Sequence, residues 1–196
     1  MIKFGTGGWR AVIGEDFTKA NIRLVAAALA RRMKREGVAE DGICVGYDRR
    51  FLSKEALIWF CEVLAGEGIR VFFVNMSCPT PQIMFTVKEK KLPYGAMVTA
   101  SHNPAIWNGI KLFTFGGRDA AQDVTEAIQE EANSLNEADI RDMGFEEAKV
   151  TDAVTIIDPR DAYLDSILKQ VNTDAIRKRR LRIVLDPMFG VSMSGL

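Results

Sequence analysis

Short apolar runs that alternate regularly with longer amphipathic segments constrain the fold more than any other feature of this sequence. Helical spacing of apolar residues or a capping signal, such as Asp16-Phe17-Thr18 or Ser53, predicts helices over residues 18–36, 53–68, 81–90 and 121–136. Short runs rich in β-branched and aromatic residues predict strands over residues 43–47, 71–74, 95–99 and 108–113. Such alternation favours a three-layer α/β/α fold around a mainly parallel (mixed) sheet.

The pattern weakens after residue 136, where acidic residues accumulate, and we therefore expect a domain boundary near Asp152. Residues 1–152 would form the first domain, and residues 153–196 an incomplete second α/β domain. Within the second part we predict a helix over residues 160–171 and a strand over residues 181–185. The helix has an apolar stripe, and a unit of about 40 residues is near the lower limit for an independent core. We expect disorder or self-association there.

Composition excludes several classes of partner. The 26 basic and 26 acidic residues balance to zero net charge, so no overall field would attract nucleic acid or an anionic membrane surface. Three cysteines, an odd number set in apolar surroundings, fit neither a disulfide framework nor a zinc site. The sequence shows no signal peptide and no apolar run of membrane-spanning length, which predicts a cytoplasmic protein.

Ser101 is the best candidate nucleophile. It follows the apolar run 95–99 directly, in Thr99-Ala100-Ser101-His102-Asn103-Pro104, where Asn-Pro predicts a turn. The carboxyl ends of strands in open α/β sheets are where ligands bind. Alternatively, Ser101 and Asn103 only satisfy backbone amides of the turn.

Two cations are candidates for binding phosphate. Lys111 lies within an apolar strand, where lysine rarely sits without a partner. It would attract phosphate or transfer a proton, or else form a structural salt bridge. Arg10 follows the glycine-rich stretch of residues 4–8, whose backbone amides could cradle phosphate oxygens. The alternative is an ordinary glycine turn with Arg10 as a surface charge.

Four stretches together resemble the α-D-phosphohexomutase superfamily, which includes phosphoglucomutase and phosphomannomutase. They occur in family order and read Phe4-Gly5-Thr6-Gly7-Gly8-Trp9-Arg10, Gly46-Tyr47-Asp48-Arg49-Arg50, Thr99-Ala100-Ser101-His102-Asn103-Pro104 and Asn108-Gly109-Ile110-Lys111. Residues 183–190 resemble the opening of the family's second domain. The family's magnesium-binding aspartate loop, sugar-reading loop and C-terminal phosphate-gripping domain have no counterpart here. The resemblance thus implies the N-terminal portion of a longer enzyme.

The resemblance implies a phosphoserine mechanism. Ser101 would pass its phosphoryl group to a hexose phosphate, form a hexose 1,6-bisphosphate and recover the other phosphoryl, converting 1-phosphate to 6-phosphate. Arg10 and Lys111 would contact phosphate, with Lys111 also a candidate general acid/base. His102 would orient near the phosphate or simply stabilise the turn. The phosphate on Ser101 would give Mg²⁺ one ligand, the other ligands being absent from this chain.

The remaining family positions are assigned supporting roles. Asp48 and Arg50 are expected to form an ion pair beneath the serine loop, and Asn103 and Asn108 to shape it. The departures Gly7 and Trp107 from commoner family residues leave the hexose unassigned among glucose, mannose and glucosamine phosphates.

Two other functions compete with the mutase hypothesis. One is a non-catalytic domain that binds phosphate or serves in assembly, because the chain alone should have little activity. The other is a serine hydrolase. It is poorly supported, because the Gly-x-Ser-x-Gly elbow is missing and the only histidine, His102, is adjacent to Ser101.

Overall fold

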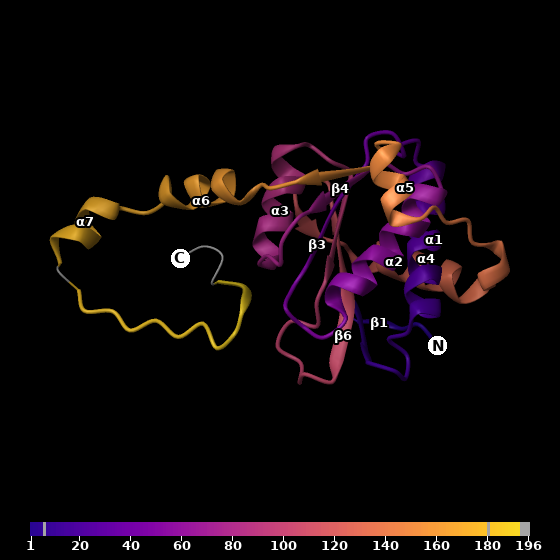
Figure 1. The fold of residues 1–196 in the computed structure, drawn as a ribbon, viewed down its shortest axis with the longest axis horizontal. Helices are drawn as coiled ribbons and strands as arrows, with labels where there is room; N and C mark the ends of the chain where they lie inside the picture. The colour runs from indigo at the N-terminus through magenta and orange to yellow at the C-terminus, as the bar shows by residue number, and fades with distance from the viewer. Residues whose placement is uncertain (6, 180, 193–196) are drawn as a thin grey trace.

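A sheet of eight strands forms the centre of the structure, a computed structural model that describes residues 1–5, 7–179 and 181–192. The strands are β1 (Phe4–Gly5), β2 (Gly8–Val12), β3 (Ile43–Tyr47), β4 (Val71–Val74), β5 (Tyr94–Val98), β6 (Trp107–Thr114), β7 (Arg118–Asp119) and β8 (Val154–Ile157). The helices are α1 (Lys19–Arg35), α2 (Ser53–Gly66), α3 (Thr80–Glu89), α4 (Gln122–Ser134), α5 (Phe145–Val150), α6 (Arg160–Leu168) and α7 (Thr173–Lys178). Helix α3 covers one face of the sheet, and α1, α2 and α4 lie on the other (Figure 1). This arrangement is the predicted three-layer α/β/α fold.

All the helices and strands predicted between residues 18 and 136 are present, with ends that differ by at most two residues. The sequence pattern misses β2, which at five residues is as long as β3, because the glycine-rich stretch before Arg10 indicates a loop rather than a strand. The other elements that it misses are shorter strands or short helices. Strands β1 and β7 have two residues each, too few to produce a visible alternation of polar and apolar side chains.

Strand direction divides the sheet into two parts. The spatial order is β1-β2-β6-β5-β3-β4-β8, with β7 beside β6. Strands β5, β3, β4 and β8 pair in parallel, whereas β6 is antiparallel to both β5 and β2. Strand β6 can therefore return directly from the end of β5 through a short loop. That loop carries Ser101.

The sheet continues past the predicted domain boundary. Strand β8 pairs in parallel with β4, from Val71 opposite Val154 to Val74 opposite Ile157. Asp152 lies in the turn between α5 and β8 and has a left-handed φ of 58°. The sheet therefore includes residues on both sides of the expected boundary and ends at Ile157. The division into two domains stays a prediction.

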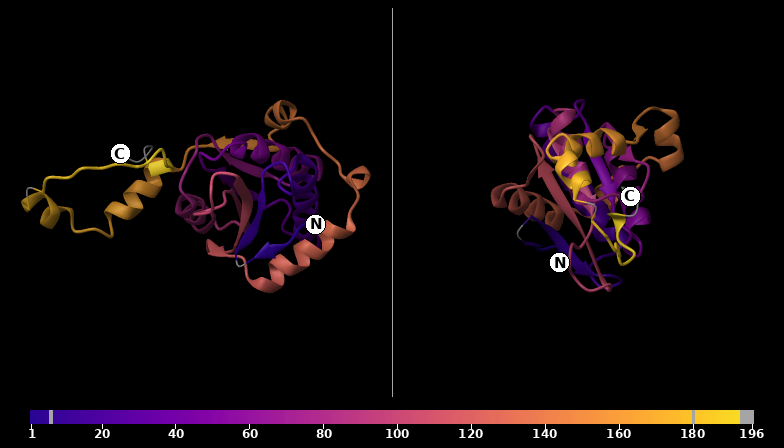
Figure 2. Two further views of the ribbon diagram at one scale, coloured as in Figure 1. Left: turned by 90° about the horizontal axis from the view of Figure 1, so that it is seen from below. Right: turned by 90° about the vertical axis from the view of Figure 1, so that its left-hand side faces the viewer.

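The C-terminal segment extends away from the sheet (Figures 1 and 2). Helix α6 contacts α3, where the rings of Tyr163 and Phe85 lie 5.8 Å apart. The strand predicted over residues 181–185 is not formed, and the prediction is wrong. No described strand pairs with this stretch, and Val184 is 98% exposed, so its β-branched side chains have no surface to pack on. Within the described residues, no helix is long and apolar enough to cross a membrane.

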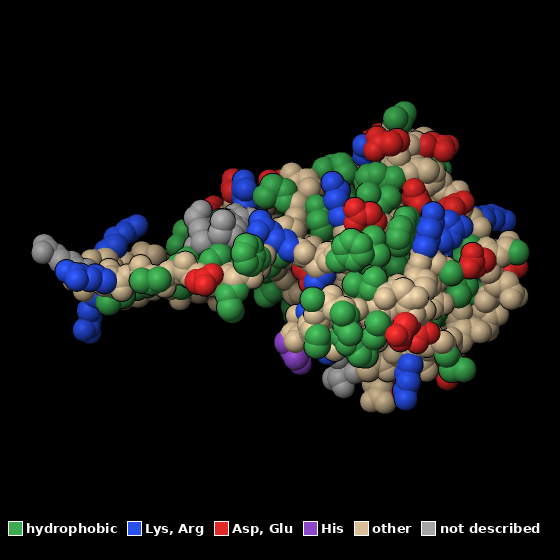
Figure 3. Space-filling view, turned by 60° about the horizontal axis from the view of Figure 1, so that its bottom comes forward, with side chains coloured by type: hydrophobic (Ala, Val, Ile, Leu, Met, Phe, Trp, Pro, Cys, Tyr) green, Lys and Arg blue, Asp and Glu red, His purple; other side chains and the backbone are tan. Residues whose placement is uncertain are grey.

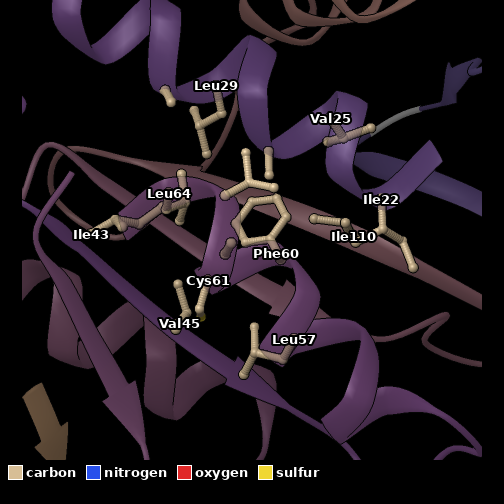
Figure 4. Packing of buried hydrophobic residues seen from close by; sticks show 14 of the residues in the cluster. Ile22, Val25, Leu29, Ile43, Val45, Leu57, Phe60, Cys61, Leu64 and Ile110 are labelled. Atoms are coloured by element: carbon tan, nitrogen blue, oxygen red, sulfur yellow. The ribbon is translucent and has the colours of Figure 1, made fainter. Parts of the chain in front are cut away.

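The main core lies between the sheet and helices α1 and α2. Leu29 of α1 and Phe60 and Leu64 of α2 pack together over Val45 and Ile110 of the sheet (Figure 4). All five side chains are fully buried. Their burial fixes the two strands that flank β5, because Val45 lies on β3 and Ile110 on β6.

The two predicted helix caps have different outcomes. Thr18 caps α1, since its hydroxyl accepts a hydrogen bond from the Asn21 amide at 3.3 Å. Ser53 does not cap α2, because it is already the first helical residue and its hydroxyl donates to Asp48 at 2.8 Å. Leu52 is the N-cap residue instead, with a left-handed φ of 62° and no capping side-chain bond.

Candidate active site

Ser101 lies on the loop that joins β5 to β6, and its side chain is exposed. Its φ of 55° is left-handed, which is uncommon for a residue other than glycine and costs on the order of 1 kcal/mol or more. The Ser101 amide donates to Thr99 Oγ1 at 3.0 Å, and the Asn103 amide donates to the Ala100 carbonyl at 3.0 Å. These bonds hold a tight turn that displays the serine hydroxyl at the end of β5.

The Arg50 side chain holds this loop in place through hydrogen bonds to its backbone carbonyls. Its Nη1 donates to the carbonyls of Pro104 (2.9 Å) and Trp107 (3.0 Å), and its Nη2 to those of Ser101 (2.8 Å) and Asn103 (2.6 Å). One guanidinium therefore satisfies four backbone acceptors of the serine loop. The five donors of the planar arginine group are suited to this task, whereas a lysine ammonium is not.

Asp48 and Arg50 form the expected ion pair, with 3.5 Å between Asp48 Oδ2 and Arg50 Nε. The other carboxylate oxygen of Asp48 accepts from the Arg50 amide at 2.9 Å and from Ser53 Oγ. Both side chains are about one-sixth exposed, at 16% and 15%. The pair orients the arginine towards the loop.

Asn108 is fully buried at the start of β6. Its Nδ2 donates to the Phe51 carbonyl (3.0 Å) and to Ser53 Oγ (2.9 Å), and its Oδ1 accepts from the Gly109 amide (2.8 Å). A continuous chain of hydrogen bonds thus joins Asp48, Ser53 and Asn108. It ties the returning strand to the segment that carries Arg50.

Gly109 is required by the close approach of β2 and β5 on its two sides. A Cβ atom at this position would lie 2.1 Å from the Trp9 carbonyl oxygen and 3.1 Å from that of Thr99. Only glycine allows this spacing. Gly109 pairs with Arg10 across β2 and β6, which brings Arg10 next to the serine loop.

Arg10 reaches the serine loop through one hydrogen bond, from its Nη1 to Asn103 Oδ1 at 3.3 Å. Its Nε is buried and has no hydrogen-bond partner among the described residues. No carboxylate among the described residues forms an ion pair with Arg10. The guanidinium therefore keeps donors available for an anion, as expected for a phosphate-binding residue.

Lys111 lies opposite Met97 of β5 and Gly8 of β2, and its Nζ forms an ion pair with Asp119 Oδ1 at 2.9 Å. The salt-bridge interpretation of this lysine therefore describes the geometry. A hollow opens beside Ser101, and Lys111 is not among the described residues that line it. Its part in phosphate binding or proton transfer stays a prediction.

His102 is exposed beside Ser101, and Figure 3 shows the single histidine in purple on the surface. Its Nδ1 lies 3.4 Å from Ser101 Oγ, at the long end of hydrogen bonding. Which group donates depends on the tautomer of the ring. The contact can orient the serine hydroxyl.

A hollow of about 790 Å³ opens beside Ser101. Its walls are the turn of residues 48–51, the segment 78–81 that enters α3, the serine loop and residues 188–191. The sequence alone does not indicate that Arg49 and Cys78 line this hollow. Arg49 stood within the Gly46–Arg50 motif, whereas nothing in the sequence marks Cys78. Burial raises the pKa of Cys78 to about 12, so its thiol is neutral near pH 7.

The described residues alone do not make a magnesium site. No three histidine, cysteine, aspartate or glutamate side chains among them converge to hold a metal ion. Asp48, the acidic residue in the described wall of the hollow, already binds Arg50 and Ser53. A phosphate on Ser101 would offer one oxygen, and the remaining ligands would have to come from other residues.

An exposed serine thus lies on a strained loop at the carboxyl edge of an α/β/α sheet, with arginines beside it. Comparison with known proteins identifies the family to which this domain belongs. The family description "Phosphoglucomutase/phosphomannomutase, alpha/beta/alpha domain I" matches residues 1–139. The chain therefore belongs to the phosphoglucomutase/phosphomannomutase family.

Individual relatives extend the likeness over more of the chain. A phosphoglucomutase/phosphomannomutase of Thermococcus kodakarensis is 34% identical over 193 residues, covering 95% of this chain and 40% of the relative. A phosphoglucosamine mutase of Prochlorococcus marinus is 29% identical, covering 95% of this chain and 39% of the relative. A phosphoglucomutase of Staphylococcus saprophyticus is 33% identical over 138 residues, which is 69% of this chain and 25% of the relative.

Solved structures share the fold. A Thermus thermophilus protein assigned as a phosphomannomutase superposes with a TM-score of 0.76 and 31% identity, over 89% of this chain and 37% of its own. The phosphoglucomutase parafusin from Paramecium superposes with a TM-score of 0.75 at 19% identity, over 96% of this chain and 39% of its own. The chain thus spans between a quarter and two-fifths of the length of these curated relatives.

Proposed function

We propose that this chain is the phosphoserine-carrying part of a hexose-phosphate mutase. The observation that carries the proposal is the Ser101 loop, in which an exposed serine with left-handed backbone is held by four hydrogen bonds from Arg50. The relatives are named for glucose, mannose and glucosamine phosphates, so the substrate class is a hexose phosphate. The particular hexose stays unassigned.

The proposed reaction moves one phosphoryl group at a time. The bond between phosphorus and Ser101 Oγ breaks as a bond forms to the free hydroxyl of a hexose monophosphate, and the proton of that hydroxyl ends on Ser101 Oγ, which becomes a hydroxyl again. The resulting hexose 1,6-bisphosphate turns around and returns its other phosphoryl group to Ser101. In this second transfer Ser101 Oγ gives up its proton to the hexose oxygen that is released. The net change is the interconversion of 1-phosphate and 6-phosphate. Such transfers depend mainly on positioning and on neutralising charge.

The cations near the loop would supply part of that neutralisation. Arg10 has free donors and touches the loop through Asn103, so it can bind phosphate oxygens. Lys111 contributes positive charge from the neighbouring strand. Its use as a general acid or base requires its ion pair with Asp119 to open. His102 would hold the serine hydroxyl or its phosphate in place.

We further propose that the isolated chain of 196 residues catalyses the mutase reaction only slowly. The family resemblance assigns the metal aspartates and the grip on the substrate's distal phosphate to segments with no match here. Loss of such electrostatic partners typically costs about two to three orders of magnitude in rate or more. A coupled assay showing a normal enzymatic rate for the isolated chain would contradict this.

Phosphorylation of Ser101 tests the proposal. The purified chain is incubated with glucose 1,6-bisphosphate, and intact mass and peptide mapping locate any phosphoryl group. We expect modification at Ser101, none in Ser101→Ala, and an unchanged level in Ser134→Ala, which alters an exposed serine of α4. No phosphate on Ser101, even with the remaining domains of a relative supplied, would refute the mutase function. Labelling of Ser101 by a fluorophosphonate would instead favour the hydrolase.

A further inference from the structure

A second, smaller hollow of about 240 Å³ lies on the N-terminal hairpin formed by β1 and β2. Its described lining consists of Lys3, Phe4, Gly5, Gly8 and Arg10. Two of these side chains are cationic and none is acidic. Only Arg10 among them belongs to the site described above.

The register of the hairpin is consistent with the two cations lining one hollow. Phe4 pairs with Trp9 and Gly5 with Gly8, and continuing this register by one residue beyond β1 would set Lys3 opposite Arg10. Phe4 and Trp9 pack against the core, and side chains alternate between the faces of a strand. Lys3 and Arg10 therefore project together from the opposite face of the hairpin, away from the core.

Neither cation is neutralised by a described residue. Lys3 makes no ion pair in the part of the chain that the structure describes, and Arg10 makes only its long bond to Asn103 there. Arg10 Nε is buried without a partner there, so it lacks both water and a protein acceptor. A buried donor left unsatisfied costs about 1–3 kcal/mol. Only an acceptor that reaches Nε itself would remove that penalty, whereas the remaining Nη donors of the guanidinium can bind an anion in the hollow directly.

The floor of the hollow suits a compact, highly charged anion. Gly5 and Gly8 have no side chains to keep such a group away from the backbone. A Cβ at Gly8 would lie 2.9 Å from the Ile110 carbonyl oxygen, so the sheet itself requires glycine there. The position therefore stays open for structural reasons.

We propose that Lys3 and Arg10 form a binding subsite for a phosphate monoester group on the N-terminal hairpin. Lys3 is a further binding residue, and Arg10 links the subsite to the serine loop through Asn103. The source of the phosphate rests on the proposed mutase function. The binding itself does not, because it requires no transfer to Ser101.

One experiment distinguishes phosphate binding at the subsite from the mutase function. In the Ser101→Ala background, which cannot accept a phosphoryl group, the full chain is titrated with inorganic phosphate and with glucose 6-phosphate, and backbone amide shifts of Gly5 and Gly8 are followed by NMR. We expect both amides to shift, and Lys3→Ala to weaken binding by roughly ten-fold. Lys3→Arg should stay within about three-fold, since it keeps the charge. The matched control Lys88→Ala alters an exposed lysine of α3 and should change nothing.

Equal affinities for the two ligands would identify phosphate alone as sufficient, and tighter binding of glucose 6-phosphate would identify the sugar phosphate; either supports the subsite. Binding by Lys3→Ala that matches Lys88→Ala would overturn it. So would amide shifts confined to the serine loop. Failure of Ser101 phosphorylation with binding intact would count against the mutase function and leave the subsite standing.

Discussion

Removal of the Arg50 guanidinium should loosen the serine loop more than any other single change at the site. Its bonds to the carbonyls of Asn103 and Trp107 are partly buried, and those to Ser101 and Pro104 are exposed. A hydrogen bond to a charged group contributes about 1.5 kcal/mol or more when shielded, and exposed contacts only a few tenths. Arg50→Ala should therefore destabilise the fold by about 3 kcal/mol, roughly a hundred-fold in the unfolding equilibrium.

Urea unfolding measures this directly. With a slope of about 2 kcal/mol per molar urea, a loss of about 3 kcal/mol lowers the midpoint by about 1.5 M. Arg50→Lys should lose most of the same free energy, because one ammonium group cannot reach four carbonyls. The adjacent Arg49 provides the control. It is exposed, and among the described residues its side chain makes only a 3.4 Å hydrogen bond to Ser77, so Arg49→Ala should stay within about 0.5 kcal/mol.

The same variants also test whether Arg50 affects phosphorylation of Ser101. If Arg50 holds Ser101 in its left-handed conformation, Arg50→Ala should also slow phosphorylation of Ser101 under conditions in which the variant remains folded. Unfolding midpoints that coincide for Arg50→Ala and Arg49→Ala would refute the assigned role of the four bonds. Unchanged phosphorylation would separate loop stability from serine reactivity.

Three further outcomes are expected. Gly109→Ala should lower the free energy of unfolding in urea by about 3 kcal/mol, because its Cβ would lie 2.1 Å from the Trp9 carbonyl oxygen. Gly144→Ala is the control and should be nearly neutral, because a Cβ there would have no described atom within 4 Å. Equal unfolding midpoints for the two variants would contradict this. Cys78, whose pKa burial raises to about 12, should resist iodoacetamide at a mildly alkaline pH until the chain unfolds, and rapid native labelling would count against it. The exposed apolar residues of the C-terminal segment, such as Leu168 (56%), should promote self-association. Light scattering should show a mass that rises with concentration and falls in Leu168→Glu, while a monomer with a protease-resistant C-terminal segment would oppose it.

Local sequence pattern predicted the elements that make their own hydrogen bonds or bury a continuous apolar face. Helix α1 is an example, because its cap at Thr18 and its apolar positions lie within one segment. Strand β8 was missed as part of the first sheet, since its place depends on pairing with β4, far away in the chain, in a register that sets Val71 opposite Val154. The failed strand over residues 181–185 shows the converse. Strand-like composition has no effect without a neighbour that accepts the hydrogen bonds.

Site residues follow the same division. The sequence brought Ser101 and Arg50 to attention through their motifs, and both lie at one edge of the sheet. It could not predict the partner of Lys111, because Asp119 reaches it only after β7 folds back on β6. Nor could it show that Lys3 and Arg10 line one hollow, because that depends on the pairing of a two-residue strand.

The serine loop shows why such long-range contacts matter to chemistry. A left-handed serine is unfavourable by itself, so the loop needs support from elsewhere to stay in that conformation. The support comes from Arg50, from Asn108 at the return of the chain, and from the hydroxyl of Ser53 between Asn108 and Asp48. Each of these groups belongs to a segment fixed by the core rather than by the loop. The serine hydroxyl can therefore be exposed while its backbone stays in one position, which the proposed phosphoryl transfer would require.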